Sequence, residues 1–156
     1  MVEFALAAPV LFLLVWGIIE IAHLFFVYNT VVVAAREASR YGATELHKND
    51  CAGMRQVAKR AGAGLAGIAD SDITIFYDEG PDPANAEQTL KGQFVCGLVS
   101  PSPLYPYPIT YGTRVTVTVT GHYSPLVPII EFTPLTITSA STHTILIDIP
   151  ISTPEP

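Results

Sequence analysis

Residues 2–35, VEFALAAPVLFLLVWGIIEIAHLFFVYNTVVVAA, decide the fold, because they form one apolar run with no Lys or Arg before Arg36. As an α-helix with a rise of about 1.5 Å per residue, this run is about 50 Å long, which exceeds a hydrocarbon core of about 30 Å. Its apolar residues lie on all sides of such a helix rather than on one stripe. The run must therefore be buried on every side, either in lipid or among other helices.

Two carboxylates interrupt this run, Glu3 in its first turn and Glu20 in its middle. An ionised carboxylate at the centre of a membrane helix costs about 2.5–3.5 kcal/mol, so each needs a partner or a proton. Glu3 complements the positive end of the helix dipole, and it either sits among lipid headgroups or meets the α-amino group of a neighbouring chain. Glu20 has His23 as its nearest local partner, and the alternative is a protonated Glu20 in the membrane. We expect both carboxylates to act in assembly.

Pro9 and Gly17 are the weak points of this helix. Pro9 lacks an N–H and so removes one hydrogen bond, and Gly17 has a low helix propensity. We expect them to act in assembly too, and we predict that any melted or kinked segment lies between them. The small residues of the run allow helix backbones to approach closely; they are Ala5, Ala7, Ala8 and Gly17.

The chain has 156 residues, and the part beyond the helix suits one small domain. The whole chain has 14% charged residues and a mean hydropathy of +0.39, unlike a disordered protein. A net charge of −6 argues against nucleic acid as a partner, since phosphate binding needs a basic surface. From Tyr28 onward polar residues appear and the helix becomes amphipathic, with one face available to pack on a sheet.

A second helix is predicted from Cys51 to about Ile68, capped by Asp50 or Asn49. Its apolar face comprises Met54, Val57, Ala58, Ala61, Leu65 and Ile68, with Arg55 placed elsewhere. The strands that we predict span Asp72–Tyr77, Gly92–Val99, Thr113–Tyr123 and about Pro134–Ile149. The fold class is therefore α+β: a long N-terminal hydrophobic helix that continues into a small domain with a second helix and an antiparallel sheet of about four strands. The valines of 113–123 are expected to face the helix and the threonines to face outward.

The chain offers few residues for chemistry. Cys51 and Cys96 are its two cysteines, and we expect either a disulfide between them or two separate buried thiols. The histidines are scattered, although His122 and His143 could approach each other across strands. No nucleophile motif, phosphate-binding loop, dinucleotide fingerprint or metal-ligand spacing is present. We therefore predict no enzyme activity, no catalytic, cofactor-binding or metal residues and no cofactor.

Three N-terminal motifs resemble the TadE-like family, which comprises pilin-like proteins of the tight-adherence (Flp-type) branch of the type IV pilus superfamily. They are Val2 to Pro9 (VEFALAAP), Gly17 to Glu20 (GIIE) and Ala34 to Gly42 (AAREASRYG). The stretch from Arg114 to Tyr123, with SPLVP after it, is also similar to the end of the family's extracellular domain.

The resemblance implies a type IV pilin-like fold divided into a transmembrane or filament-core helix, residues 1–35, and an extracellular α+β domain, residues 36–156. It implies that Glu3 corresponds to the glutamate near the processed end of type IV pilins, and that Pro9 to Gly17 can unwind on assembly. Family precursors carry a short basic leader that a prepilin peptidase removes. Since no such leader precedes Glu3, we expect this sequence to be a processed or trimmed form.

Two functions follow from the resemblance. The first is a structural subunit of an extracellular Tad-type pilus: a homopolymer joined by helix–helix packing, with Glu3 setting the register. The second is a low-copy TadE-like minor pseudopilin that primes assembly from the inner membrane. Both imply the prepilin peptidase and the Tad-type secretion machinery as partners. A single-span membrane protein with a periplasmic binding or catalytic domain is the third hypothesis, and the missing active-site residues weaken it.

Overall fold

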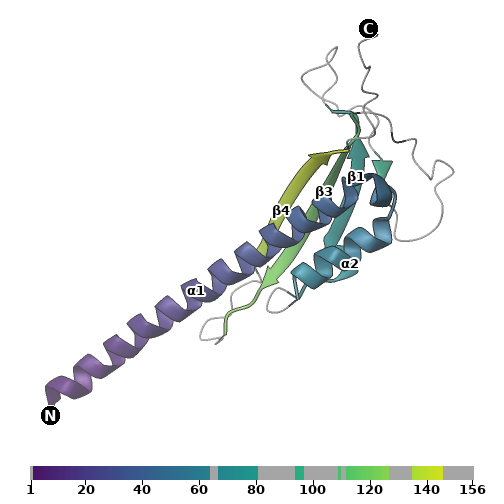
Figure 1. Cartoon of the computed structure of the whole chain (residues 1–156). Helices are drawn as coiled ribbons and strands as arrows, with labels where there is room; N and C mark the ends of the chain where they lie inside the picture. The colour runs from purple at the N-terminus through teal and green to yellow at the C-terminus, as the bar shows by residue number, and fades with distance from the viewer. Residues whose placement is uncertain are drawn as a thin grey trace, which may run out of the picture.

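The computed structural model describes residues 2–63, 67–80, 94–96, 109, 112–126 and 135–145, apart from the side chains of Val2, Ala5 and Phe94. Its elements are α1 (Val2–Gly42), η1 (Glu45–His47), α2 (Cys51–Ala61), η2 (Asp70–Asp72), β1 (Ile73–Asp78), β2 (Phe94–Val95), β3 (Arg114–Tyr123) and β4 (Leu135–Thr144). Figure 1 shows α1 running past the sheet and far beyond it, with α2 beside its C-terminal part. The predicted α+β fold is confirmed.

The sheet is antiparallel, and its strand order is β2-β1-β3-β4. Three of its strands are long, whereas β2 has two residues. In the middle of the sheet Val117 lies opposite Ile75 on β1 and opposite Ser141 on β4. The predicted strands are thus recovered, although the part of 92–99 that the structure describes as strand is shorter than expected. β4 ends at Thr144 rather than near Ile149, and residues 146–149 lie outside the described chain.

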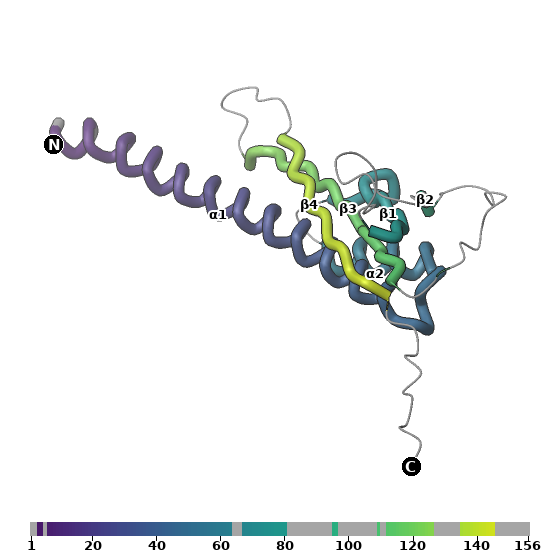
Figure 2. Tube along the Cα trace, turned by 90° about the horizontal axis from the view of Figure 1, so that it is seen from above, coloured from purple at the N-terminus to yellow at the C-terminus, as the bar shows by residue number. Residues whose placement is uncertain are grey.

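The hydrophobic core lies between one face of the sheet and the two helices, which cover the same face (Figure 2). The strands contribute the fully buried valines 115, 117 and 119, as their alternation predicts. The helix contributes a stripe that begins at Val27 and continues through Val31. Gly121 allows this close approach, because a Cβ there would lie 2.4 Å from a methyl carbon of Val31.

α1 is one continuous helix of 41 residues through Pro9 and Gly17. The expected melted or kinked segment between these two residues is therefore wrong for the single chain. Pro9 removes one hydrogen bond, and the helix on either side keeps the bonds that hold its geometry. Gly17 costs about 1 kcal/mol relative to Ala, which is small for a cooperative helix of this length. The helix also crosses position 35 without a break, so the division at that residue stays a prediction.

The second helix is shorter than predicted, because it ends at Ala61 instead of near Ile68. Gly62 follows directly, and its N–H donates a hydrogen bond to the carbonyl of Ala58 at 2.8 Å. Ile68 lies against this position, since a Cβ on Gly62 would lie 2.2 Å from its Cδ1. The predicted apolar periodicity continued past this glycine, where the side chain of Ile68 occupies the space that a Cβ would need.

Candidate functional site

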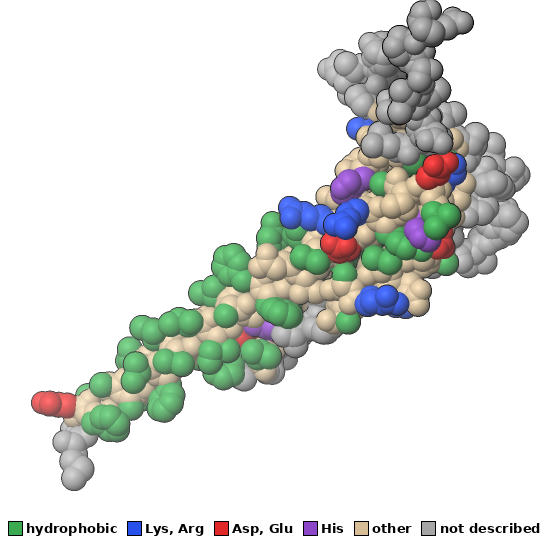
Figure 3. All heavy atoms as spheres, viewed as in Figure 1, with side chains coloured by type: hydrophobic (Ala, Val, Ile, Leu, Met, Phe, Trp, Pro, Cys, Tyr) green, Lys and Arg blue, Asp and Glu red, His purple; other side chains and the backbone are tan. Residues whose placement is uncertain are grey.

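The N-terminal half of α1 is the candidate site, because it projects from the domain with its apolar side chains uncovered. From Phe4 to Val15 the large apolar side chains are 45–77% exposed. The described chain contains one helix that is long and apolar enough to cross a membrane, Leu6–Gly42, with a mean hydropathy of 2.4 over its most apolar window. Figure 3 shows hydrophobic side chains along the projecting helix and charged ones over the domain. This surface requires lipid or other helices to cover it.

Glu3 lies exposed in the first turn of this projecting helix. Among the described residues it has no ion-pair partner. No residue of the described domain competes for its carboxylate, which is therefore available to another molecule or to a polar membrane surface.

Glu20 has a partner that the sequence did not reveal. Its Oε1 accepts hydrogen bonds from the hydroxyl of Tyr123, at the end of β3, and from the backbone N–H of Leu126 at 3.2 Å. The expected pairing with His23 is wrong: neither ring nitrogen of His23 has a hydrogen-bond partner among the described residues. Oε1 of Glu20 is thus paired with the domain of its own chain, 103 residues further along the sequence, whereas Oε2 is buried without a partner among the described residues.

Tyr123 contacts both Glu20 and His23, the two side chains that were predicted to pair with each other. Its ring lies against that of His23, with 5.3 Å between the ring centroids. Burial raises the pKa of Tyr123 to about 12, and the hydrogen bond to the Glu20 carboxylate adds to this effect. Tyr123 therefore stays protonated and remains a donor to Glu20 at physiological pH. The sequence does place a tyrosine at the end of a predicted strand, but no local spacing shows that this tyrosine contacts Glu20.

Ser39 and His143 form the one pair that resembles catalytic machinery in the described chain. The hydroxyl of Ser39 lies 3.0 Å from Nδ1 of His143 and 2.9 Å from the hydroxyl of Ser141. A serine beside a histidine base is the start of a nucleophilic site. Ser39 is fully buried between α1 and β4, however, so no substrate can reach it. The cluster instead fastens the helix to the sheet through hydrogen bonds.

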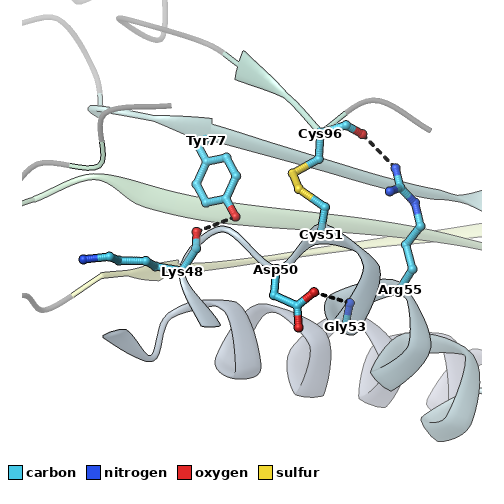
Figure 4. Close-up of a disulfide and its surroundings, with 7 residues drawn as sticks. All are labelled: Lys48, Asp50, Cys51, Gly53, Arg55, Tyr77 and Cys96. Atoms are coloured by element: carbon cyan, nitrogen blue, oxygen red, sulfur yellow. Dashed lines mark hydrogen bonds between the residues drawn. A yellow bond between two sulfur atoms is a disulfide. The ribbon is translucent and has the colours of Figure 1, made fainter. Parts of the chain in front are cut away.

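Cys51 and Cys96 are joined in a disulfide with 6.0 Å between their Cα atoms, which ties the start of α2 to the residue after β2 (Figure 4). The cap of α2 is Asp50, whose carboxylate accepts a hydrogen bond from the N–H of Gly53 at 2.8 Å. Arg55 was expected away from the core, but it is nearly buried, and its Nη2 donates to the carbonyl of Cys96 at 2.8 Å. The hydrogen bond to the Cys96 carbonyl gives the buried guanidinium of Arg55 a polar partner.

The run Asp78-Glu79-Gly80-Pro81 predicts the start of an exposed loop, 78–87, that contacts the outside. The structure corrects this, because Asp78 is the last residue of β1 and is fully buried. Its Oδ1 accepts from Nε of Arg114 at 2.8 Å, from Nη2 of the same guanidinium, and from the N–H of Gly80 at 2.8 Å. Residues 81–87 lie outside the described chain. The proline-rich stretch 101–111 predicts a second exposed contact loop, and most of it also lies outside the described chain.

The expected approach of His122 to His143 is wrong. His122 lies opposite Thr136 and His143 lies opposite Val115, at opposite ends of the β3–β4 ladder. His122 instead lies 3.2 Å from Oδ1 of Asp72. A hydrogen bond from the backbone N–H of Ala69, and then the contact with His122, lower the pKa of Asp72 below its ordinary value. Across the described ranges, no three His, Cys, Asp or Glu side chains gather as a metal site.

The comparison with protein families identifies the N-terminal segment. Residues 1–40 match the family model for TadE-like protein. This TadE-like segment covers the projecting helix, both of its carboxylates and the first part of its packing on the sheet. The resemblance is thereby confirmed for these residues, and it suggests a protein associated with a Tad pilus. Comparison with curated proteins and comparison with solved structures each gave no match.

Proposed function

We propose that this chain is a structural subunit of an extracellular Tad-type pilus. The observation that carries the proposal is the TadE-like helix, which projects from a folded domain with apolar side chains exposed on all its faces. Packing many such helices together buries these faces in a filament core and leaves the α+β domains outside. Before assembly the same helix is held in the inner membrane, where a prepilin peptidase and the Tad-type secretion machinery act on it.

Moving these helices from lipid into contact with one another gains little hydrophobic free energy, because lipid is already apolar. Polymerisation therefore depends on polar pairing and close packing. The small residues Ala7, Ala8 and Gly17 permit close approach, and a Cβ added at Gly17 would meet no atom within 4 Å. Glu3 is the exposed carboxylate of the first turn. It sets the register, because a misaligned subunit would leave that charge unpaired in a dry core. Oε1 of Glu20 accepts two hydrogen bonds within its own subunit, whereas Glu3 is exposed and has no ion-pair partner among the described residues, so we assign intermolecular pairing to Glu3.

The alternative function is that of a low-copy TadE-like pseudopilin, anchored in the inner membrane, that primes a pilus made of other subunits. The family match favours this role as well, since it is to TadE-like proteins. Both roles use the same helix and differ in the number of copies. The composition of the filament therefore distinguishes them.

The experiment is electron microscopy of filaments sheared from cells, together with mass spectrometry of the purified material. We expect this chain to dominate the filament mass. A filament in which the chain is a trace component assigns it the priming role instead. A chain found in membranes and never with filaments contradicts both.

Replacing Glu3 by Ala tests the register role. We expect the domain to stay folded, because Glu3 contacts none of it, and filament yield to fall at least about tenfold, which corresponds to about 1.4 kcal/mol per contact. The matched control is Glu79→Ala, which removes an exposed carboxylate from the domain. Normal piliation by the Glu3 variant would show that another residue sets the register.

A further inference from the structure

The end of the sheet nearest the N-terminus of α1 lies beside the projecting helix, at a level that a membrane would occupy. The backbone N–H of Leu126 donates to the Glu20 carboxylate at 3.2 Å, which places Leu126 within one side-chain length of that turn of α1. Leu126 and Leu135 are 51% and 52% exposed. Two large apolar side chains are thus uncovered next to the apolar helix.

The depth of this level follows from the length of the helix. The exposed apolar residues begin at Phe4, directly after the charged Glu3. A hydrocarbon core of about 30 Å spans about 20 residues from there and ends near Leu24. Glu20 lies about four residues, or about 6 Å, inside that boundary. Tyr28 follows it, and tyrosine is typical of the interfacial belt of a membrane helix.

The same end of the sheet continues the apolar surface of the helix. An open groove is lined by Leu24, Phe25, Tyr28, Leu135 and Ile137, none of which is charged. The described segments 123–126 and 135–137 also contain no charged residue. The first basic residue of α1 is Arg36, about 18 Å beyond Leu24 along the helix. His122, opposite Thr136, is the titratable group next to this surface, and it is paired with Asp72. Lipid is the partner that fits the uncharged surface continuous with the membrane helix.

From this geometry we propose that the β3–β4 end of the domain is a second membrane-contacting element, in which Leu126 and Leu135 insert into the lipid bilayer beside α1. The proposal rests on the proposed anchoring of α1 in the membrane. It also accounts for the contacts of Glu20: a carboxylate at this depth needs hydrogen-bond donors that lipid does not provide, and Tyr123 and Leu126 supply two of them to its Oε1. The domain is then held at the membrane surface by two attachments, and its orientation is fixed before assembly.

The test uses the full chain in phosphatidylcholine–phosphatidylglycerol vesicles, with one added cysteine labelled by an environment-sensitive fluorophore and with lipids brominated on their acyl chains. The labelled positions are Leu126→Cys and Leu135→Cys. The matched control is Leu46→Cys, an 87% exposed leucine in η1, and the positive reference is Phe12→Cys, which is 74% exposed on the projecting helix. Labelling without reductant leaves the Cys51–Cys96 disulfide closed.

We expect bromine quenching at 126 and 135 to reach about half of that at 12 or more, as for side chains buried in the headgroup and acyl boundary, with none at 46. Strong quenching at 12 with none at 126 and 135 would overturn the second attachment and leave the anchored helix intact. Blue-shifted emission at 126 and 135 without quenching would show that a second copy of the chain covers the groove, which also overturns it. No quenching at 12 would refute the membrane anchoring itself.

Discussion

Opening the disulfide between Cys51 and Cys96 should loosen the domain without changing α1. The bond closes a loop with a sequence separation of 45, which contains α2 and β1 and reaches the residue after β2. A cross-link of this kind restricts the unfolded chain, since it removes conformations that the open loop would explore. The double substitution Cys51→Ser and Cys96→Ser removes this restriction and keeps the side chains small and polar.

The magnitude follows from the length of the loop. For a separation of 45 residues the chain-entropy relation gives about 4 kcal/mol at 25 °C. For a domain of this size the loss corresponds to a fall of about 15 °C in the midpoint of thermal unfolding. Such a loss is a large share of the 5–15 kcal/mol that is typical of folded domains.

The assay is thermal unfolding of the full chain in detergent, followed by near-ultraviolet circular dichroism of the tyrosines. Tyr77 is a suitable reporter because its buried ring lies near the disulfide and its hydroxyl donates to the carbonyl of Lys48 at 2.7 Å (Figure 4). Fluorescence of the single tryptophan, Trp16, would report the projecting helix instead. Wild-type protein treated with reductant should unfold at the same temperature as the double variant.

Arg55→Met provides the control. It removes the hydrogen bond to the Cys96 carbonyl and leaves the disulfide in place, so it should cost about 1–2 kcal/mol. If the double variant loses no more stability than this control, the loop-closure reasoning is refuted. The same holds if reductant leaves the unfolding midpoint of the wild type unchanged.

The remaining predictions concern polar contacts of the sheet. Tyr123→Phe removes the hydroxyl donor to Glu20, and should lower the free energy of unfolding by about 1.5–3 kcal/mol in detergent; an unchanged unfolding midpoint would contradict it. Arg114→Met leaves the Asp78 carboxylate buried without its cation and should cost about 3 kcal/mol, part of which a second substitution, Asp78→Asn, should restore in denaturant titrations. The stabilising contribution of Asp72 is complete above its ordinary pKa of 3.8 and is lost as the pH falls through the lowered pKa of the folded state, so Asp72→Asn should flatten the acid limb of a stability–pH profile.

The local patterns of the sequence were sufficient for most of the fold. An apolar run without basic residues predicts α1, because its length suffices to cross a membrane as a helix. The alternation of Val115, Val117 and Val119 predicts the buried face of β3, because side chains alternate between the two faces of a strand. The end of α2 was missed, because the apolar spacing continued past Gly62 while the chain turned. Arg55 was misplaced for a related reason: its burial depends on a carbonyl 41 residues away.

For the polar part of the candidate site, the sequence predicts that a partner is required but not which residue provides it. The sequence shows that Glu20 requires a partner, since a lone carboxylate in an apolar helix is costly. It does not show which partner, because the donors come from the far end of β3 and depend on how α1 lies along the sheet. His23 was preferred for its spacing alone, and Asp78 was assigned to a loop because of the Gly and Pro residues that follow it.

The continuity of α1 also determines how the subunit bears mechanical load. A pull on the N-terminal end passes along one unbroken helix into the stripe from Val27 to Ala38, which lies along β3 and β4 (Figure 1). Because the helix runs alongside these strands, such a pull slides the two layers past each other, and the contacts along the stripe must yield together rather than one after another. The Ser39 hydrogen bonds to β4 resist the same sliding. A fibre built on this helix would transmit tension directly into the cores of its subunits.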